Sequence, residues 1–204
     1  QHFGADGITI HPRQDERHIT KKDVYDIKPI ITTEYNIEGY PSEDFMQLVI
    51  EVTPEQVTLV PDGPDVITSC AGWDTVKFQD YLKEIITEFK KHGIRTSIFV
   101  DPKIEMIEAA KLCGTDRIEL YTEEYATQYI IDKKKAISPY IEAANKATEL
   151  GIGINAGHDL SLENLEYFAK HIPNLAEVSI GHSLISDALY LGLENAIQMY
   201  KRLL

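Results

Sequence analysis

One local pattern recurs four times in the 204-residue chain and limits its possible folds more than any other feature. In each copy a helical segment ends at a glycine, and a run rich in Ile, Val and Thr follows; the glycines are Gly4, Gly93, Gly114 and Gly151. Glycine often ends a helix because it adopts the left-handed conformation without steric cost. The short apolar runs indicate buried strands. Helices alternating with such strands predict a parallel sheet covered by helices.

The alternation continues along the whole chain. Strands are expected near 7–11, 33–38, 56–61, 94–100, 116–121, 152–156 and 176–180. Helices are expected near 20–29, 42–52, 75–92, 103–113, 136–150, 161–171 and 183–203, with Pro102 and Pro139 where a helix opens. No stretch has the composition of a linker between domains, so residues 1–204 are expected to form a single domain.

Seven strand–helix units predict a TIM barrel, the (β/α)₈ fold, with one unit missing from this sequence. Such a barrel has eight strands and typically about 250 residues. Residues 1–4 have the character of a helix tail, so we expect the first strand and most of the first helix to precede them, on the order of 30 residues. A doubly wound open sheet is the alternative, but its first strand usually leads into a Gly-rich phosphate turn. Here that turn is His11-Pro12-Arg13.

Composition narrows the classes of function. The net charge of −13 argues against binding of nucleic acid or anionic membranes, since both require a basic surface. No apolar run reaches the roughly 18 residues that indicate a membrane-spanning helix. The two cysteines, Cys70 and Cys113, form no disulfide framework, so a reducing compartment, the cytoplasm, is expected.

Polar residues gather at the carboxyl ends of the predicted strands, where TIM barrels build their active sites. Histidine there suits proton transfer, because its pKa of about 6.5 is close to neutral pH. Glu119 is flanked by Ile118 and Leu120, so its carboxyl should point into the barrel, either in a structural ion pair or toward a cationic intermediate. The candidates are His11, Arg13, Glu38, Glu119, Asn155, His158, Gly181 and His182, with Thr68 in the long loop 62–74.

Two features predict anion binding. Arg13, Arg17 and His18 concentrate basic groups after the first predicted strand, and arginine is well suited to phosphate. At Gly181 and His182 a strand leads directly into a helix, whose first N–H groups would also suit a phosphate. Two such sites would imply two phosphorylated substrates. The loop 62–74 lies over the same face and is expected to be a lid.

A metal centre is the main rival interpretation. The side chains of His11, Glu38, His158 and His182 could ligate Zn²⁺ or Mn²⁺ across the barrel mouth. Against this, the sequence has no His-x-His, no HExxH and no cysteine ligand pattern. A metal-dependent phosphosugar isomerase or epimerase stays open as an alternative function. The second alternative function is that of a non-catalytic barrel that binds phosphometabolites.

Several motifs together resemble one known family from end to end and in the same order. They are GADGITIHPRQDERHIT, YNIEGYP, TLVPD, RIELYTEEYA, INAGHDLS and SIGHSLISDALYLGL. The family they resemble is pyridoxine 5′-phosphate synthase, the PdxJ family. The resemblance implies a (β/α)₈ barrel assembled from dimers into a homo-octamer, with no metal or redox cofactor. It implies condensation of 3-amino-2-oxopropyl phosphate with 1-deoxy-D-xylulose 5-phosphate to pyridoxine 5′-phosphate, inorganic phosphate and water, the last step of vitamin B6 synthesis.

The resemblance also implies roles for individual residues. His11 corresponds to a catalytic proton acceptor, Glu38 to a second general base and His158 to a proton donor. Glu119 resembles the residue proposed to stabilise the transition state. The positions that would bind deoxyxylulose phosphate are Arg13, His18 and Thr68. Those that would bind the aminoketone phosphate are Asp159, Gly181 and His182.

Overall fold

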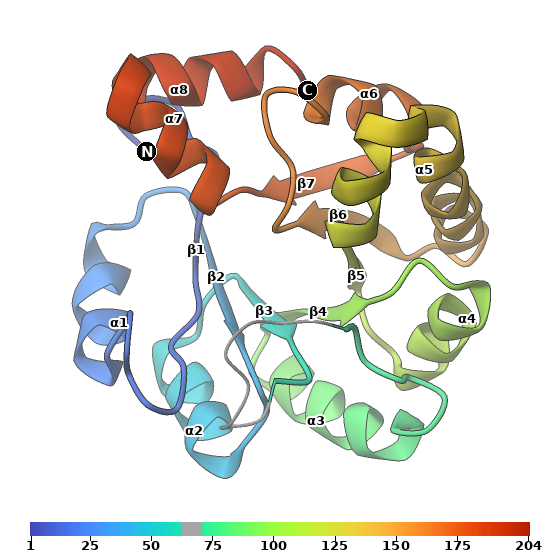
Figure 1. Ribbon diagram of the computed structural model, residues 1–204. Helices are drawn as coiled ribbons and strands as arrows, with labels where there is room; N and C mark the ends of the chain where they lie inside the picture. Colours follow the sequence, from blue (N-terminus) through green and yellow to red (C-terminus); the bar gives the residue numbers. More distant parts are fainter. Residues whose placement is uncertain (63–70) are drawn as a thin grey trace.

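Each strand of the sheet pairs in parallel with the next strand along the chain. A computed structural model describes residues 1–62 and 71–204. Its seven-stranded sheet follows the order β1 to β7, with helices around the outside (Figure 1). The strands are β1 (Gly7–Ile10), β2 (Glu34–Gly39), β3 (Gln56–Leu59), β4 (Arg95–Val100), β5 (Arg117–Tyr121), β6 (Gly153–Gly157) and β7 (Leu175–Ser179).

The helices alternate with these strands. They are α1 (Lys21–Ile27), the 3₁₀ helix η1 (Lys28–Ile30), α2 (Glu43–Val52), α3 (Gln79–Lys91), α4 (Ile104–Cys113), α5 (Glu123–Glu149), α6 (Leu165–His171), α7 (His182–Leu191) and α8 (Leu193–Lys201). This order confirms the predicted α/β barrel class. It rules out the doubly wound alternative, because the strand order of such a sheet reverses at a switch point.

The sheet curls until its first and last strands approach each other. The hydroxyl oxygens of Thr9 in β1 and Ser179 in β7 lie 3.4 Å apart. The N-terminal segment packs against α8, where Gln198 donates a hydrogen bond to the carbonyl of Phe3 (2.8 Å) and Lys201 to that of Gly4 (2.7 Å). The barrel is therefore nearly closed, with the N-terminus beside α7 and α8 (Figure 1).

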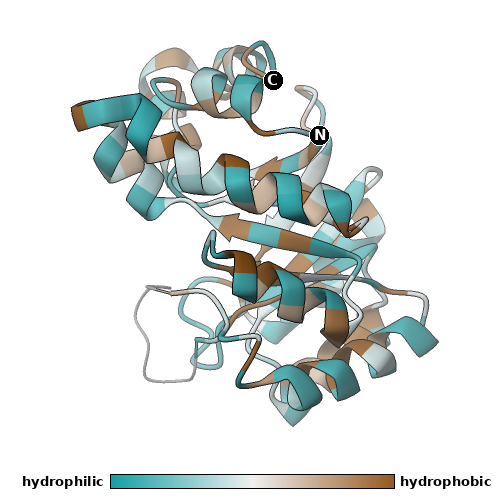
Figure 2. Ribbon diagram, turned by 90° about the vertical axis from the view of Figure 1, so that its right-hand side faces the viewer, coloured by the Kyte–Doolittle hydropathy of each residue, from teal (hydrophilic) through white to brown (hydrophobic). Residues whose placement is uncertain are grey.

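Strand alternation separates an apolar outer face from a polar interior. Successive side chains of a strand point to opposite faces, and Ile37, Val57 and Ile118 are fully buried between sheet and helices. Amphipathic helices cover that outer face, and Figure 2 shows apolar and polar segments alternating along them. The polar residues that alternate with the apolar ones, also buried, are Asn36, Glu38, Gln56, Thr58, Ser97, Glu119 and Asn155.

Two of the predicted helices differ from the structure by more than a few residues at their ends. Helix α5 begins at Glu123, well before the expected residue 136, and it is kinked at Asp132 (φ −153°, ψ 97°). The Asp132 carboxylate accepts hydrogen bonds from the N–H groups of Lys134 and Lys135, so it starts the second half of the helix. Pro139 therefore lies inside the helix and not at its opening.

The expected helix 183–203 is in fact two helices, α7 and α8. They are separated at Gly192, whose φ of +81° is outside the right-handed helical region. Within the described ranges, no helix combines the length and the apolar character that a membrane crossing requires.

Candidate active site

Three strands carry acid–base side chains to one point at the carboxyl end of the barrel. Glu38 comes from β2, Glu119 from β5 and His158 from the residue after β6, and their nearest ligand-type atoms all lie within 4.8 Å of one another. His158 Nε2 is 3.5 Å from Glu38 Oε2, and His11 Nδ1 is 3.9 Å from the same oxygen. The structure thus brings together the four residues predicted to be catalytic, here called the acid–base cluster.

Glu38 and His158 form the charged pair of the cluster. Burial opposes ionisation of Glu38, but its hydrogen bond to His158 and the charges of His158, His11 and Arg13 outweigh burial and hold the pKa of Glu38 below its usual range. Burial likewise disfavours the His158 cation, but the hydrogen bond and charge of Glu38, with the charge of Glu119, raise the pKa of His158 to about 9. Near neutral pH, Glu38 is a carboxylate and His158 carries a proton.

The other two members of the cluster are uncharged near neutral pH, because His11 lacks the extra proton and Glu119 retains its own. Burial, aided by the charges of Arg13 and His158, lowers the pKa of His11 despite the carboxylate of Glu38. Burial and the negative charge of Glu38 raise the pKa of Glu119 to about 8. Neither carboxyl oxygen of Glu119 has a hydrogen-bond partner among the described residues. At pH 7 the cluster therefore holds two proton donors and two proton acceptors side by side.

These raised pKa values predict that the protein loses stability as the pH increases. In the folded protein the pKa of Glu119 is about 8, against the usual value of 4.5, and the pKa of His158 is about 9, against 6.5. The folded state therefore binds both protons more tightly than the unfolded chain. An unfolded chain releases both protons earlier, so stability falls across this window. We expect the melting temperature to decrease by roughly 5 °C or more between pH 6 and pH 9.5.

Calorimetry of the wild type and of Glu119→Gln tests this expectation. The glutamine side chain does not titrate, so the decrease should be smaller in the variant. An identical pH dependence in both proteins would contradict the assignment of a proton to Glu119.

Phe99 and Gly157 shape the cluster, and sequence reasoning missed both. The ring of Phe99 in β4 packs 5.0 Å from that of His158. A Cβ atom at Gly157 would lie only 2.3 Å from Glu119 Oε1, so the missing side chain makes room for that carboxyl. A glycine inside a strand signals such a close approach, and the NAGH motif contained that signal.

Arg13 pairs with a carboxylate that the sequence prediction did not include. Its guanidinium Nη2 lies 3.7 Å from Oδ2 of Asp62, a nearly buried residue shortly after β3. The position of Asp62 past the carboxyl end of a strand could have identified it. The pair places a positive charge beside His11 at the edge of the cluster.

The remaining predicted residues lie farther out. His18 is exposed, and within the described chain no contact joins it to the acid–base cluster. Gly181 and His182 are exposed at the start of α7. Asp159 is half-buried, and burial together with Glu123 raises its pKa against the opposing charges of His158 and His182. Thr68 and most of the expected lid, residues 63–70, lie outside the described residues.

The structure changes the set of residues that could ligate a metal ion. Of the described residues, the group with suitable spacing is Glu38, Glu119 and His158. It adds Glu119 to the predicted set and includes neither His11 nor His182. Two carboxylates and an imidazole could hold a divalent cation. The charges of the same three groups also explain their protonation states without a metal ion. A chelation experiment therefore decides between a metal centre and an acid–base site.

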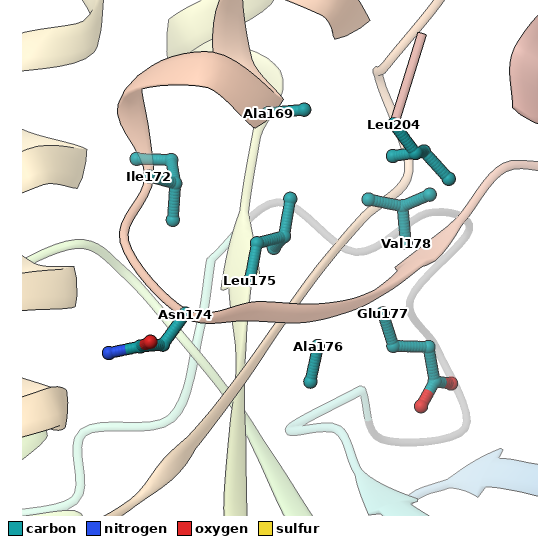
Figure 3. A pocket seen from close by; sticks show the side chains of 8 residues that line it. All are labelled: Ala169, Ile172, Asn174, Leu175, Ala176, Glu177, Val178 and Leu204. Atoms are coloured by element: carbon teal, nitrogen blue, oxygen red, sulfur yellow. The ribbon is translucent and has the colours of Figure 1, made fainter. Parts of the chain in front are cut away.

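A cavity of about 310 Å³ lies beside β7, and Figure 3 shows the side chains that line it. None of the described residues that line it belongs to the cluster. The lining consists of Ala169, Ile172, Asn174, Leu175, Ala176, Glu177, Val178 and Leu204.

Comparison with known proteins agrees with this arrangement. The family model described as "Pyridoxal phosphate biosynthesis protein PdxJ" matches residues 1–204. The chain belongs to the PdxJ family. Pyridoxine 5′-phosphate synthase of Flavobacterium johnsoniae is 64% identical over 200 residues, which cover 98% of this chain and 84% of the relative. The Bacteroides fragilis protein of the same name is 63% identical over 202 residues, covering 99% and 85%. The predicted family is thereby confirmed.

Solved structures confirm the fold of this PdxJ-family chain. The 3-keto-L-gulonate-6-phosphate decarboxylase of Vibrio cholerae superposes with a TM-score of 0.67 at 10% identity, covering 98% of this chain and 85% of that one. Phosphoribosyl anthranilate isomerase of Thermotoga maritima gives 0.60 at 14%, covering 98% and 88%. At such identities the likeness extends to the barrel architecture alone.

Proposed function

We propose that this PdxJ-family protein is a pyridoxine 5′-phosphate synthase. It condenses 3-amino-2-oxopropyl phosphate with 1-deoxy-D-xylulose 5-phosphate and releases pyridoxine 5′-phosphate, inorganic phosphate and water. The observation that carries the proposal is the acid–base cluster, which sets two proton donors against two acceptors at one point of the barrel mouth. The name shared by relatives with more than 60% identity supports it.

The reaction needs several proton transfers around one carbon skeleton. An amine adds to a ketone and loses water to give an imine, and later steps enolise, eliminate and close the ring. Each step moves a proton to or from carbon, nitrogen or oxygen, and a single nucleophile could not serve all of them. A cluster of four titratable groups with different pKa values matches this requirement.

Each member of the acid–base cluster then has a role. The protonated His158 donates to a leaving oxygen, while Glu38 and the neutral His11 accept protons. Glu119 holds a proton at pH 7, but a cationic imine beside it would favour the carboxylate. It can therefore release its proton as positive charge develops and stabilise that charge.

Two groups of residues are proposed to bind the two phosphorylated substrates. Arginine at position 13 suits a phosphate, and the N–H groups at the start of α7 offer a second anion site. We assign deoxyxylulose phosphate to Arg13, His18 and Thr68. We assign the aminoketone phosphate to Asp159, Gly181 and His182.

We further propose that the protein acts in the cytoplasm as a homo-octamer built from dimers. Large exposed apolar side chains on α7 support self-association, because a contiguous apolar surface often marks an interface. They include Ile185, Leu189 and Tyr190, of which Tyr190 is 91% exposed.

Incubation with both substrates tests the proposed function. We expect pyridoxine 5′-phosphate to form, followed by its absorbance and fluorescence, with a rate that EDTA changes by less than about twofold, since acid–base chemistry needs no Lewis acid. Loss of activity on chelation, restored by Zn²⁺ or Mn²⁺, would favour the metal-dependent isomerase or epimerase. Binding of the phosphosugar without any product would favour the non-catalytic barrel.

A further inference from the structure

Thr122 is fully buried between β5 and α5, and its hydroxyl lies beside the backbone of His158. Oγ1 donates a hydrogen bond to the carbonyl of Gly157 at 2.6 Å. The same oxygen accepts one from the N–H of Asp159 at 3.1 Å. One hydroxyl thus contacts the residues on both sides of His158.

The backbone of His158 needs such support. Its φ of +90° lies in the region that residues other than glycine rarely adopt. Strained conformations of this kind persist where the surrounding structure determines them. The His158 N–H also donates to the carbonyl of Ser179 (3.2 Å), and Asn164 Nδ2 donates to the carbonyl of Asp159 (3.2 Å).

The helix that follows does not use the Thr122 hydroxyl. Thr122 is the N-cap residue of α5, a position where a threonine side chain usually accepts a hydrogen bond from the first turn. Here it makes no such bond. The N–H of Tyr125 in that turn donates to the phenol oxygen of Tyr140 instead, at 3.2 Å. This arrangement leaves the Thr122 hydroxyl for the segment that carries His158.

We propose that Thr122 is a positioning residue, which holds the backbone of residues 157–159 so that the imidazole of His158 is aimed at Glu38. The inference rests on the proposed function, because the proton-donor role of His158 is part of it. A hydroxyl both donates and accepts in this clamp, so serine can replace threonine but valine cannot.

Thr122→Val and Thr122→Ser form the matched test. We expect valine to lower kcat about 10- to 100-fold, the loss typical of a misplaced catalytic group, with KM for deoxyxylulose phosphate changing less than about threefold. Serine should restore most of the activity. In NMR titrations of the ligand-free protein, the pKa of His158 should move from about 9 toward 6.5 in the valine variant, and the pH profile of kcat should shift with it.

Thr115→Val is the control for loss of a buried hydroxyl. Thr115 Oγ1 lies within hydrogen-bond distance of the carbonyl oxygens of Arg117 (2.8 Å) and Thr96 (3.1 Å) at the other end of β5, and its single O–H can donate to either. We expect this variant to lose stability while keeping its kcat and the pKa of His158. Thr122→Ala repeats the main test without either γ-methyl group of valine, should the valine variant fold poorly.

His158→Gln separates the two levels of inference. If this variant keeps wild-type activity, the proposed role of His158 is wrong whatever Thr122 does. If it is inactive while Thr122→Val and Thr122→Ala keep the wild-type kcat and the wild-type pKa of His158, the positioning role of Thr122 is overturned.

Discussion

Replacing Glu38 with glutamine is expected to lower kcat by about 10²- to 10⁴-fold, the usual contribution of general acid–base catalysis. Glu38 Oε2 contacts both histidines of the acid–base cluster, at 3.5 Å from His158 and 3.9 Å from His11. Glutamine keeps the shape of the side chain but can neither accept a proton nor stabilise the His158 cation. The substitution therefore removes the general base and also the negative charge that keeps His158 protonated.

Two measurements on Glu38→Gln check this expectation. Product formation reports kcat, and NMR titration should show the pKa of His158 falling from about 9, since Glu38 is the main group that raises it. Glu51→Gln serves as the control, because Glu51 is exposed on α2 and its carboxylate accepts hydrogen bonds from Tyr25 and Gln47, away from the acid–base cluster. A Glu38→Gln enzyme that retains more than a third of the wild-type kcat would contradict the assignment.

Replacing Gly157 with alanine is expected to lower kcat about 10- to 100-fold by displacing Glu119, a loss typical of a misplaced catalytic group. The new Cβ would meet Glu119 Oε1 at 2.3 Å and Ser179 Cβ at 3.3 Å, inside a strand. Overpacking of this kind typically reduces the free energy of unfolding by about 1–3 kcal/mol. The φ of Gly157 is not positive, so any effect comes from the space that the methyl group takes.

A double-mutant cycle with Glu119→Ala identifies the cause of the loss. If Gly157→Ala acts through Glu119, it should have little further effect on kcat once that carboxyl is gone. Gly153→Ala is the control on the same strand, because its methyl group would meet the flexible side chain of Arg117 and no member of the cluster. Equal losses of kcat in both Glu119 backgrounds would refute the spatial argument.

Much of the site could be predicted because barrel geometry turns sequence order into position. The carboxyl ends of parallel barrel strands meet at one face, so residues that end predicted strands share that face. His11, Glu38 and His158 follow from this rule. Glu119 follows from its place between two apolar strand residues, which are buried on the other side of the sheet.

Residues that act through space were not predicted. Phe99 and Thr122 matter through the distances to their neighbours, and sequence spacing does not encode those distances. Asp62 and Gly157 carried a positional signal, but only the fold shows which side chains they meet. The kink of α5 was missed for a related reason. The capping bonds of Asp132 open the second half of the helix, whereas the pattern alone suggested that Pro139 did so.

The sequence by itself determined the family, the order of strands and helices, and the residue types that reach the barrel mouth, because these depend on local periodicity and on motifs. Tertiary structure alone decided which groups carry protons. Glu38 and Glu119 are both buried glutamates, yet contact with His158 lowers the pKa of Glu38, while burial beside that carboxylate raises the pKa of Glu119. A pKa depends on burial and on charges a few ångströms away, and only the folded chain brings these together.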